Sequence, residues 1–316
     1  MKLQQLRYAL EVYRHNLNVS EAADALFTSQ PGISKQIRLL EEELGIQIFI
    51  RSGKRVVSVS QPGKAVLEIS ERILRDVQNI KNIGSEFTDH DSGSLTIATT
   101  HTQARYALPK IVAEFVKNYP KVNLTIKQGS PSAIAQMVSS GEADLAIITE
   151  RIDDHPELGK LPCYEWNHAV IVPHDHPLLD CRNPLSLEDL ASFPLVTYEF
   201  AFNSGSSIAR TFNKAHIEQP DVALSAADTD VLKTYVRLGL GVGLMAKMAY
   251  DPIVDQDLQL IDAAHLFEPS PTWIALRTDT YLRGYAYVFI QMFSPTMTRD
   301  VVDRILYTPV VEDFSI

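Results

Sequence analysis

The 316-residue sequence contains few cysteines and no long apolar segment. Its two cysteines, Cys163 and Cys181, are too few for a disulfide framework or a four-thiolate zinc site. The longest apolar stretches, such as residues 238–246, are much shorter than the roughly 20 residues that span a bilayer. The N-terminus also lacks the apolar core and small-residue cleavage site of a signal peptide. These absences predict a soluble, cytoplasmic protein with no membrane partner.

The sequence also lacks the short motifs of common enzyme sites. Neither a G-x-S-x-G elbow nor a Walker loop is present. Three glycines at 239, 241 and 243 follow a helical pattern and enter a strand, which is the reverse of the nucleotide-binding order and indicates close packing. His174 and His176 have no third ligand nearby in the sequence, so a metal site there is the weaker interpretation. We therefore expect no catalytic residues, no metal and no tightly bound cofactor.

Length and charge divide the chain into parts that are best interpreted separately. The chain is longer than an ordinary domain of roughly 100–200 residues, and it is 45% hydrophobic, enough for several cores. Its net charge is -10, but residues 1–90 hold 12 Lys+Arg and 11 Asp+Glu, whereas the remainder holds 17 and 28. Because phosphate binding depends on the local face of a protein, the acidic total does not exclude DNA as a partner of the N-terminal part.

Residues 1–45 predict a helix-turn-helix. Ser20 is expected to cap a short second helix, and Ser29 a third helix with Pro31 in its first turn. Apolar residues of the third helix fall on one stripe, which leaves Gln, Ser, Lys and Arg on the other face. Gln pairs with adenine and Arg or Lys with guanine in the major groove. The pattern indicates a recognition helix.

A basic hairpin follows the predicted helix-turn-helix. Residues 46–51 and 56–60 have the pattern of strands around a basic turn, which suits phosphate or minor-groove contact. Each piece alone is typical of a surface helix-loop-helix or a solvated turn, but their combined order favours a winged helix-turn-helix over residues 1–60. The predicted DNA-binding residues are Ser29, Gln30, Pro31, Ser34, Lys35, Arg38, Arg51, Lys54 and Arg55.

Residues 61–92 predict a linker helix and a hinge. Apolar residues recur at steps of three and four from Val66 to Phe87, with charged residues between them, as in a coiled-coil seam. The stripe could instead pack on the chain's own domain. Pairing with a second copy would place two recognition helices on two half-sites of double-stranded DNA. We therefore expect a homodimer or tetramer, while the sequence does not distinguish the two.

The N-terminal pattern resembles the LysR-type transcriptional regulators. The resemblance is carried by residues 22–26, 29–34, 37–45, 49–51 and 61–63, and it extends over essentially the whole chain. Residues 1–7, 99–109 and 229–241 resemble the branch that controls cysteine biosynthesis and sulfur assimilation. The short C-terminus is more similar to one paralogue of that branch than to the cysteine regulator itself. The resemblance implies a transcription activator that contacts RNA polymerase.

The remaining residues predict an α/β effector domain over 93–316. Strand-like segments alternate with helical ones, which indicates α/β layers with mostly parallel sheets. The resemblance adds a periplasmic-binding-protein-like clamshell, with subdomain I at about 93–163 and 267–316 and subdomain II at about 164–266. The expected strands are residues 95–98, 122–126, 143–148, 168–172, 195–198 and 242–245.

Strand–helix junctions in this domain predict a site for a small anion. Hydroxyl and amide side chains lie where strands end and helices begin, with no carboxylate among them. From composition alone, these residues fit the alternative role of helix caps about as well as they fit anion binding. The resemblance implies an effector cleft there, with Trp166 near it and Asn203 on the facing subdomain. The predicted effector-binding residues are Thr100, Thr102, Gln103, Gly129, Ser130, Thr149, Trp166 and Asn203.

The sequence thus predicts an effector-responsive, DNA-binding regulator of sulfur or sulfonate assimilation genes. The resemblance implies sulfate, thiosulfate, acetylserine or adenosine phosphosulfate as the effector, and we favour adenosine phosphosulfate. A small-anion solute-binding protein with an N-terminal oligomerisation arm is the alternative, but the missing export signal and the basic recognition helix count against it. An enzyme is a third hypothesis, disfavoured by the absence of a nucleophile and base.

Overall fold

The chain divides after Thr88 into two compact units, residues 1–88 and 89–316. The computed structural model describes residues 1–53, 55–149, 155–181, 184–203, 206–217 and 220–307. Within these ranges, no helix combines the length and apolar character that crossing a membrane requires. Each unit has its own core, so each is described separately.

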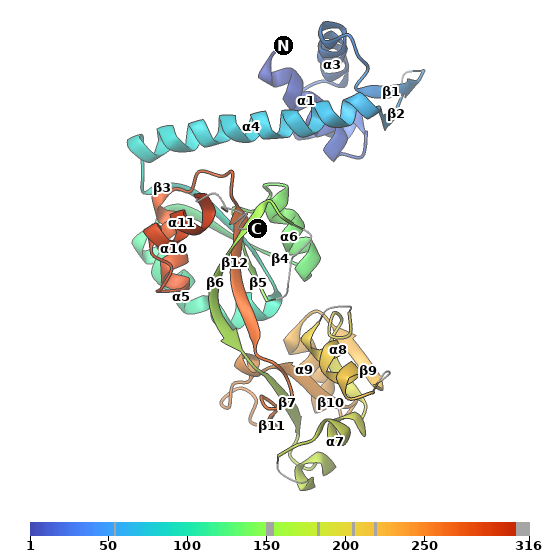
Figure 1. The fold of residues 1–316 in the computed structure, drawn as a ribbon, viewed down its shortest axis with the longest axis vertical. Coiled ribbons are helices and arrows are strands. Elements are labelled where there is room, and N and C mark those ends of the chain that lie inside the picture. Colours follow the sequence, from blue (N-terminus) through green and yellow to red (C-terminus); the bar gives the residue numbers. More distant parts are fainter. Residues whose placement is uncertain (54, 150–154, 182–183, 204–205, 218–219, 308–316) are drawn as a thin grey trace, which may run out of the picture. The chain divides into compact units, whose positions relative to one another are not determined.

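The N-terminal unit is a winged helix-turn-helix followed by a long helix (Figure 1). Its core joins apolar side chains from all of its helices to Ile48, just before β1, and to the strand residues Phe49 and Val56. The arrangement confirms the predicted helix-turn-helix and hairpin. The elements are α1 (Leu3–Arg14), α2 (Val19–Ala25), α3 (Gln30–Leu44), β1 (Phe49–Ser52), β2 (Arg55–Val59) and α4 (Gln61–Thr88).

The cap of α2 differs from the sequence prediction. Asn18, not Ser20, is the N-cap, and its side-chain oxygen accepts from the backbone N–H groups of Ser20 and Glu21 at 3.1 and 3.3 Å. The prediction of Ser20 was wrong because the helix begins at Val19, two residues earlier than expected. An Asn at that position satisfies two otherwise unpaired N–H groups.

The ends of α3 agree with the prediction. Ser29 accepts from the backbone N–H of Gly32 at 3.3 Å, and Pro31 lies in the first turn. Gly45 ends the helix at φ +67°, a left-handed conformation that glycine adopts without steric cost.

Helix α4 has two different halves. Leu67 is buried in the core of the N-terminal unit, and Val66 and Ile73 pack partly against it. Further along, Ile80 and Phe87 are 68% and 84% exposed. The second half of this helix therefore presents an apolar stripe without a partner in its own unit.

The C-terminal unit contains two five-stranded sheets. Sheet I has the order β4-β3-β5-β12-β6, and sheet II has the order β11-β7-β10-β8-β9. The strands of sheet I are β3 (Ser92–Thr99), β4 (Lys121–Gln128), β5 (Leu145–Ile148), β6 (Leu158–Trp166) and β12 (Ser270–Arg277). Those of sheet II are β7 (His168–Pro173), β8 (Leu195–Tyr198), β9 (Val222–Ala226), β10 (Val242–Ala246) and β11 (Leu258–Asp262).

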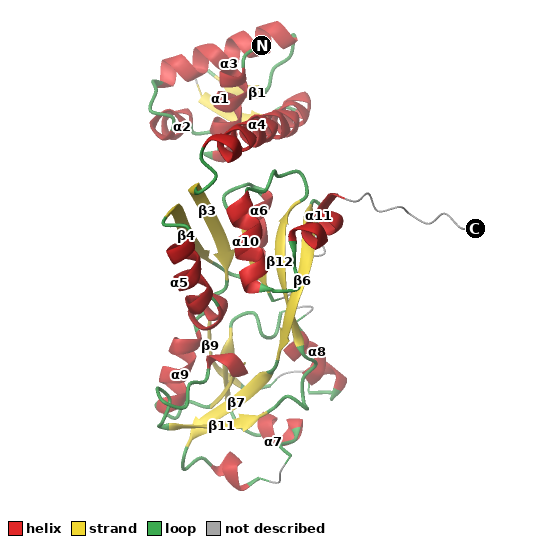
Figure 2. Cartoon of the chain, turned by 90° about the vertical axis from the view of Figure 1, so that its left-hand side faces the viewer, coloured by secondary structure: helices red, strands yellow, loops and turns green. Residues whose placement is uncertain are grey.

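Helices cover both sheets (Figure 2). Helix α6 packs on β3, β5 and β12, α11 packs on β6, and α9 packs on β7, β8, β9 and β10. The two-subdomain α/β architecture is as expected. The α-helices are α5 (Pro109–Asn118), α6 (Pro131–Ser139), α7 (Leu187–Ala191), α8 (Ser207–Lys214), α9 (Thr229–Arg237), α10 (Gly284–Phe293) and α11 (Arg299–Tyr307).

Both sheets are mixed rather than mostly parallel. Strand β3 runs parallel to β4 and β5, and β8 runs parallel to β9 and β10. However, β12 is antiparallel to β5 and β6, and β7 is antiparallel to β10 and β11. The expectation failed because the strands at the crossing points carry the chain directly from one sheet to the other, without an intervening helix. Only Asn167 separates β6 from β7.

Candidate functional site

Helix α3 presents a polar face to solvent. Gln30, Lys35 and Arg38 are exposed, and Ser34 is half-buried beside them. The opposite face is anchored by Ile33, Ile37 and Leu40, which are fully buried in the core of the unit. Packing therefore fixes the helix while its polar side chains stay available to a major groove.

The neighbouring predicted positions differ in their surroundings. Ser29 and Pro31 are exposed at the start of α3, and Arg55 is exposed at the start of β2. Lys54 lies outside the described residues. The described members of the predicted DNA-binding set thus come from one helix and one hairpin.

Arg51 makes a structural contact that the sequence did not reveal. Its Nη1 donates to Oε2 of the buried Glu41 at 2.8 Å. The other oxygen of Glu41 accepts from the backbone N–H groups of Ile48 and Phe49 at 2.9 and 3.0 Å. Arg51 and Glu41 therefore link the wing, which is the β1–β2 hairpin, to α3.

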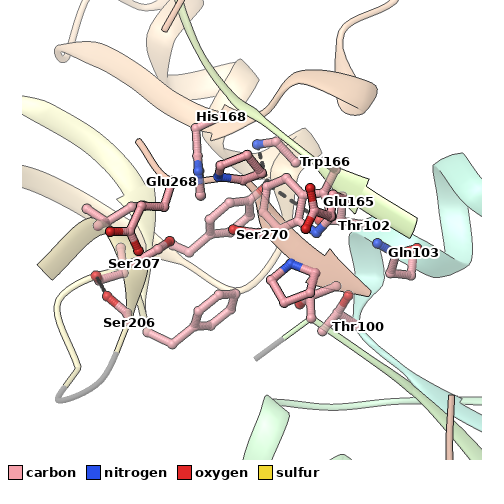
Figure 3. A pocket seen from close by; sticks show the side chains of 18 of the residues that line it. Thr100, Thr102, Gln103, Glu165, Trp166, His168, Ser206, Ser207, Glu268 and Ser270 are labelled. Carbon is pink, nitrogen blue, oxygen red and sulfur yellow. Dashed lines mark hydrogen bonds between the residues drawn. The ribbon is translucent and has the colours of Figure 1, made fainter. Parts of the chain in front are cut away.

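A cavity of about 250 Å³ lies between the two sheets of the C-terminal unit. Four of the predicted residues line it from the side of sheet I: Thr100, Thr102, Gln103 and Thr149. Trp166 lines it from the end of β6, where the chain crosses to sheet II. In Figure 3, Thr100 and Gln103 lie on one side of the cavity, and Ser206, Ser207 and Glu268 lie on the other.

Hydrogen bonds already engage part of this lining. The Thr102 hydroxyl lies 2.9 Å from the Thr229 hydroxyl and 3.4 Å from that of Tyr198, both in the sheet II subdomain. The Gln103 side-chain oxygen accepts from the Tyr164 hydroxyl at 2.5 Å. Thr102 therefore links the two subdomains, and Gln103 is held at both ends of its side-chain amide, because its Nε2 also donates to Sδ of Met248 at 3.9 Å.

Three predicted effector residues do not line the cavity. Ser130 caps α6 by accepting from the backbone N–H of Ala133 at 3.4 Å, and Gly129 precedes it. Asn203 is exposed. Both Gly129 and Ser130 follow β4, an edge strand of sheet I, so their junction lies one strand further out than that of β3. The sequence pattern alone did not distinguish these two junctions.

Several lining residues had no signal in the sequence. His168, Tyr198 and Phe200 line the cavity from the sheet II subdomain, and so does Arg210. Ser206 and Ser207 add hydroxyl groups next to α8 of that subdomain, and Glu268 and Ser270 line the cavity where the chain returns to β12 of sheet I. These residues come together only because the chain crosses between the sheets twice, and no local motif marks them.

The charges on this side are balanced within the protein. Glu268 pairs with Lys214 at 3.0 Å and with Arg210 at 3.7 Å. The hydrogen bond and charge of Lys214, together with Arg210, lower the pKa of Glu268. By contrast, His168 is 3% exposed, and burial lowers its pKa to about 4. The imidazole is therefore neutral at physiological pH.

The chain segment that follows Gln103 connects the cavity to α9. Asp230 on α9 pairs with Arg105 at 2.5 Å and accepts from the Tyr106 hydroxyl at 2.6 Å. Residues 103–107 form a π-helix (η1, Gln103–Ala107), a geometry frequent at functional sites. A ligand that shifts Gln103 would thus act on the contacts of the next residues with α9.

One group of side chains has the composition of a metal site. His101, Asp228 and Asp230 each place a ligand atom within 4.8 Å of the others. However, His101 pairs with Asp228 at 3.1 Å, and both oxygens of Asp230 are engaged by Arg105 and Tyr106. These internal pairings account for the cluster, so we assign no metal to it.

A helix-turn-helix with an exposed polar face occurs in the same chain as a cavity whose sheet I side carries hydroxyl and amide groups. Together they define a DNA-binding protein that responds to a small molecule. Residues 3–64 match the model "Bacterial regulatory helix-turn-helix protein, lysR family", and residues 88–298 match the "LysR substrate binding domain". The chain belongs to the LysR family of bacterial transcriptional regulators.

Individual relatives show to which branch of that family the chain is most similar. The chain is 50% identical to the HTH-type transcriptional regulator CysB of Burkholderia cenocepacia, over 97% of either chain. It is 42% identical to the HTH-type transcriptional regulator Cbl of Escherichia coli, over 96% of either chain. The crystal structure of the cofactor-binding domain of the Cbl transcriptional regulator aligns with a TM-score of 0.63 and 38% identity, covering 69% of this chain and 95% of that one.

These relatives confirm the sulfur-assimilation branch and the periplasmic-binding-protein-like fold. They do not favour the paralogue that the short C-terminus suggested, which is Cbl, because identity to the CysB sequence is higher. C-terminal length is a single feature, whereas identity is measured over nearly the whole chain.

Proposed function

We propose that the chain regulates sulfur-assimilation genes by binding promoter DNA through α3 and the wing, and that a small sulfur-containing anion in the cavity changes this binding. The observation that carries the proposal is the cavity itself. Thr100, Thr102, Gln103 and Thr149 line it with neutral hydrogen-bond donors from one subdomain. Neutral donors in a partly dry site suit an oxyanion, because they bind its charge without an additional buried cation.

Adenosine phosphosulfate is the effector that we favour. The cavity of about 250 Å³ is much larger than the roughly 10–15 Å³ that one water requires, so it has room for more than one sulfate group. Aromatic side chains of Trp166, Tyr198 and Phe200 line it and offer faces on which a base could stack. Sulfate, thiosulfate and acetylserine are the other candidates, and each would use fewer of these contacts.

Self-association through α4 completes the proposed DNA-binding form. Ile69, Ile80, Ile83 and Phe87 are exposed apolar residues on this helix, and a coiled-coil seam would bury them against a second copy. A dimer or tetramer would present two copies of α3 to two half-sites. Contact of the bound oligomer with RNA polymerase would then activate transcription, a step for which the family resemblance is the support.

The functional division that we propose assigns DNA reading to residues 1–60 and linkage and dimerisation to 61–92. Effector binding belongs to 93–316. The effector must bind one arrangement of the oligomer better than another, because a ligand with equal affinity for both would switch nothing.

The decisive experiment is binding of the full-length protein to sulfur-utilisation promoters, titrated in parallel with adenosine phosphosulfate, sulfate and acetylserine. A shift caused by adenosine phosphosulfate alone supports the proposal. Specific DNA binding that ignores all three ligands would remove the effector assignment and leave the DNA-binding role. Absence of specific DNA binding would favour the alternative of a solute-binding protein with an oligomerisation arm.

A further inference from the structure

The cavity wall contains a buried histidine, His168, that is not among the predicted effector-binding residues. His168 opens β7, directly after the chain crosses from sheet I, and it lines the cavity. Only 3% of it is exposed. Among the residues that the structure describes, no group hydrogen-bonds its Nδ1.

A buried imidazole without a partner is costly in a folded protein. Native structures pair the great majority of buried polar atoms, so each exception requires an explanation. Leaving a buried donor or acceptor unsatisfied costs about 1–3 kcal/mol. A phenylalanine would fill similar space without that cost, so packing alone does not account for a histidine at this position.

A second unsatisfied polar atom lies beside it. Within the described part of the chain, Nε1 of Trp166 also has no hydrogen-bond partner. The indole and imidazole rings lie 4.7 Å apart between centroids, and both side chains line the same cavity (Figure 3). An indole N–H can only donate, so any group that pairs with it must carry an acceptor.

On the premise that this cavity binds the effector, as proposed above, we infer that His168 is a specificity-determining residue that hydrogen-bonds an oxygen of the ligand alongside Trp166. The chemical class of the recognised group is an oxyanion or carbonyl oxygen. Because the imidazole is uncharged, it contributes direction rather than charge to binding. The contact reaches the ligand from the sheet II subdomain, so it requires both halves of the unit.

The neighbours of His168 support a neutral imidazole as the group that recognises the ligand. Its ring packs on Trp166 and on Phe267, whose ring centroid lies 5.3 Å away. The ionisable side chains that line the same cavity, among those described, are Glu165, Glu268 and Arg210. Arg210 already pairs with Glu268. The Glu268 carboxylate is therefore not free to pair with a charged histidine.

The test uses the full-length protein with His168→Phe, His168→Gln and the control Phe267→Leu. Phe267 packs against the imidazole but is not among the cavity-lining residues, so this control measures the effect of disturbed packing. Sulfate, thiosulfate, acetylserine and adenosine phosphosulfate are titrated by calorimetry, and melting temperatures are measured with and without each ligand.

We expect His168→Phe to weaken the tightest of these ligands by roughly tenfold, the loss of about one hydrogen bond. Its melting temperature without ligand should stay the same or rise, because an unsatisfied buried group has been removed. His168→Gln should retain most of the affinity, since an uncharged amide can replace the hydrogen bond. Wild-type affinity should not increase as the pH falls from 7.5 to 5.5.

Wild-type affinity in His168→Phe would overturn the inference, and so would an affinity gain in the wild type on acidification through the ordinary histidine range. A lowered melting temperature in His168→Phe, with no greater loss of affinity than in Phe267→Leu, would reduce His168 to a packing residue. If none of the four ligands binds the wild type, the proposed function of the cavity fails as well. Binding that His168→Phe leaves intact would overturn only the role of His168.

Discussion

The two units of this protein assemble their candidate sites in different ways. In the N-terminal unit, the described DNA-binding candidates come from one helix and one hairpin, and most of them are exposed. In the C-terminal unit, the cavity is lined by residues between Thr100 and Pro271, and Thr100, Thr102, Gln103 and His168 are buried. A local, exposed site can be recognised from sequence, whereas a site built by two chain crossings is recognised only in part: Thr100, Thr102 and Gln103 were predicted, but His168 was not.

The units also differ in the carboxylates that hold them together. Glu41 in the N-terminal unit accepts two backbone N–H groups and pairs with the partly exposed Arg51. Asp255 in the C-terminal unit is 1% exposed and pairs with Lys233 at 2.6 Å and Arg237 at 2.8 Å. Since Lys233 is itself buried, the second arrangement is the more vulnerable when its carboxylate is removed.

Asp255→Ala should have the largest effect, lowering the stability of the C-terminal unit by about 3–5 kcal/mol. The substitution leaves the Lys233 ammonium buried without its carboxylate. Calorimetry should show that the transition of the C-terminal unit moves down while that of the N-terminal unit stays in place. Asp257→Ala is the matched control, because Asp257 pairs with Arg237 at the surface, where a pair contributes about 0–1 kcal/mol. Equal effects of the two variants would contradict the prediction.

The Asp255 carboxylate also affects how the stability of the C-terminal unit changes with pH. Burial alone would raise the pKa of Asp255, but the backbone N–H of Asp251 and the side chains of Lys233 and Arg237 hold the pKa below its ordinary value. The stability that this depressed pKa provides is therefore complete above about pH 4 and is lost as the pH falls through the lower, folded-state pKa. A melting series from pH 7 to pH 3 should show less acid destabilisation in Asp255→Asn than in the wild type.

Arg38→Ala should weaken specific DNA binding by about 1–3 kcal/mol, roughly 5- to 150-fold, if its guanidinium contacts a base. Ligand binding in the other unit should not change. Arg72→Ala on α4 is a suitable control, because this arginine is also exposed but lies outside the recognition helix. Unchanged DNA affinity across a salt series would remove Arg38 from the interface.

Gln103→Ala should reduce effector affinity by about 1 kcal/mol, roughly fivefold, while DNA binding without effector is preserved. Ser130→Ala provides the control, since Ser130 was predicted for the same role but caps α6 outside the cavity. Calorimetric titration with adenosine phosphosulfate and sulfate distinguishes the two. A greater loss in Ser130→Ala would mean that the ligand binds at the β4 junction instead.

Phe27→Asn should produce the smallest effect, a gain in stability of the N-terminal unit of about 0.5–1 kcal/mol. Phe27 has φ +50° and is 98% exposed, so it bears left-handed strain without compensating burial. Asparagine tolerates this conformation better than a large side chain does. Thermal denaturation measures the change, and a loss of stability would indicate that the phenylalanine packs in a way that the fold does not suggest.

Sequence reasoning worked where the signal was periodic or local. The stripe of Ile33, Ile37 and Leu40 predicted which face of α3 is buried, and Ser29, Pro31 and Gly45 predicted where that helix begins and ends. It was less accurate where two neighbouring residues could serve the same purpose. Asn18 and Ser20 are both good N-caps, and only the start of α2 at Val19 decided between them.

The fold of the C-terminal unit was predictable as a class but not in its detail. The runs at 143–148 and 168–172 predicted strands correctly, although the first strand begins at Leu145. Strand direction was not encoded in those runs, because a strand buried on both faces has the same composition whether it is parallel or antiparallel. The mixed sheets result from β6 and β7, which follow each other with only Asn167 between them.

The sequence by itself determined the helix-turn-helix, the long linker helix, the α/β class and the family, because helical periodicity, caps and short motifs are local properties. The tertiary structure decided which hydroxyl groups face one cavity. Thr100 lines it because it follows the inner strand β3, whereas Ser130 follows the edge strand β4. It also brought His168 beside Trp166, through a crossing between two sheets. Such neighbours depend on how strands pair over long separations, and that pairing leaves no pattern in the residues themselves.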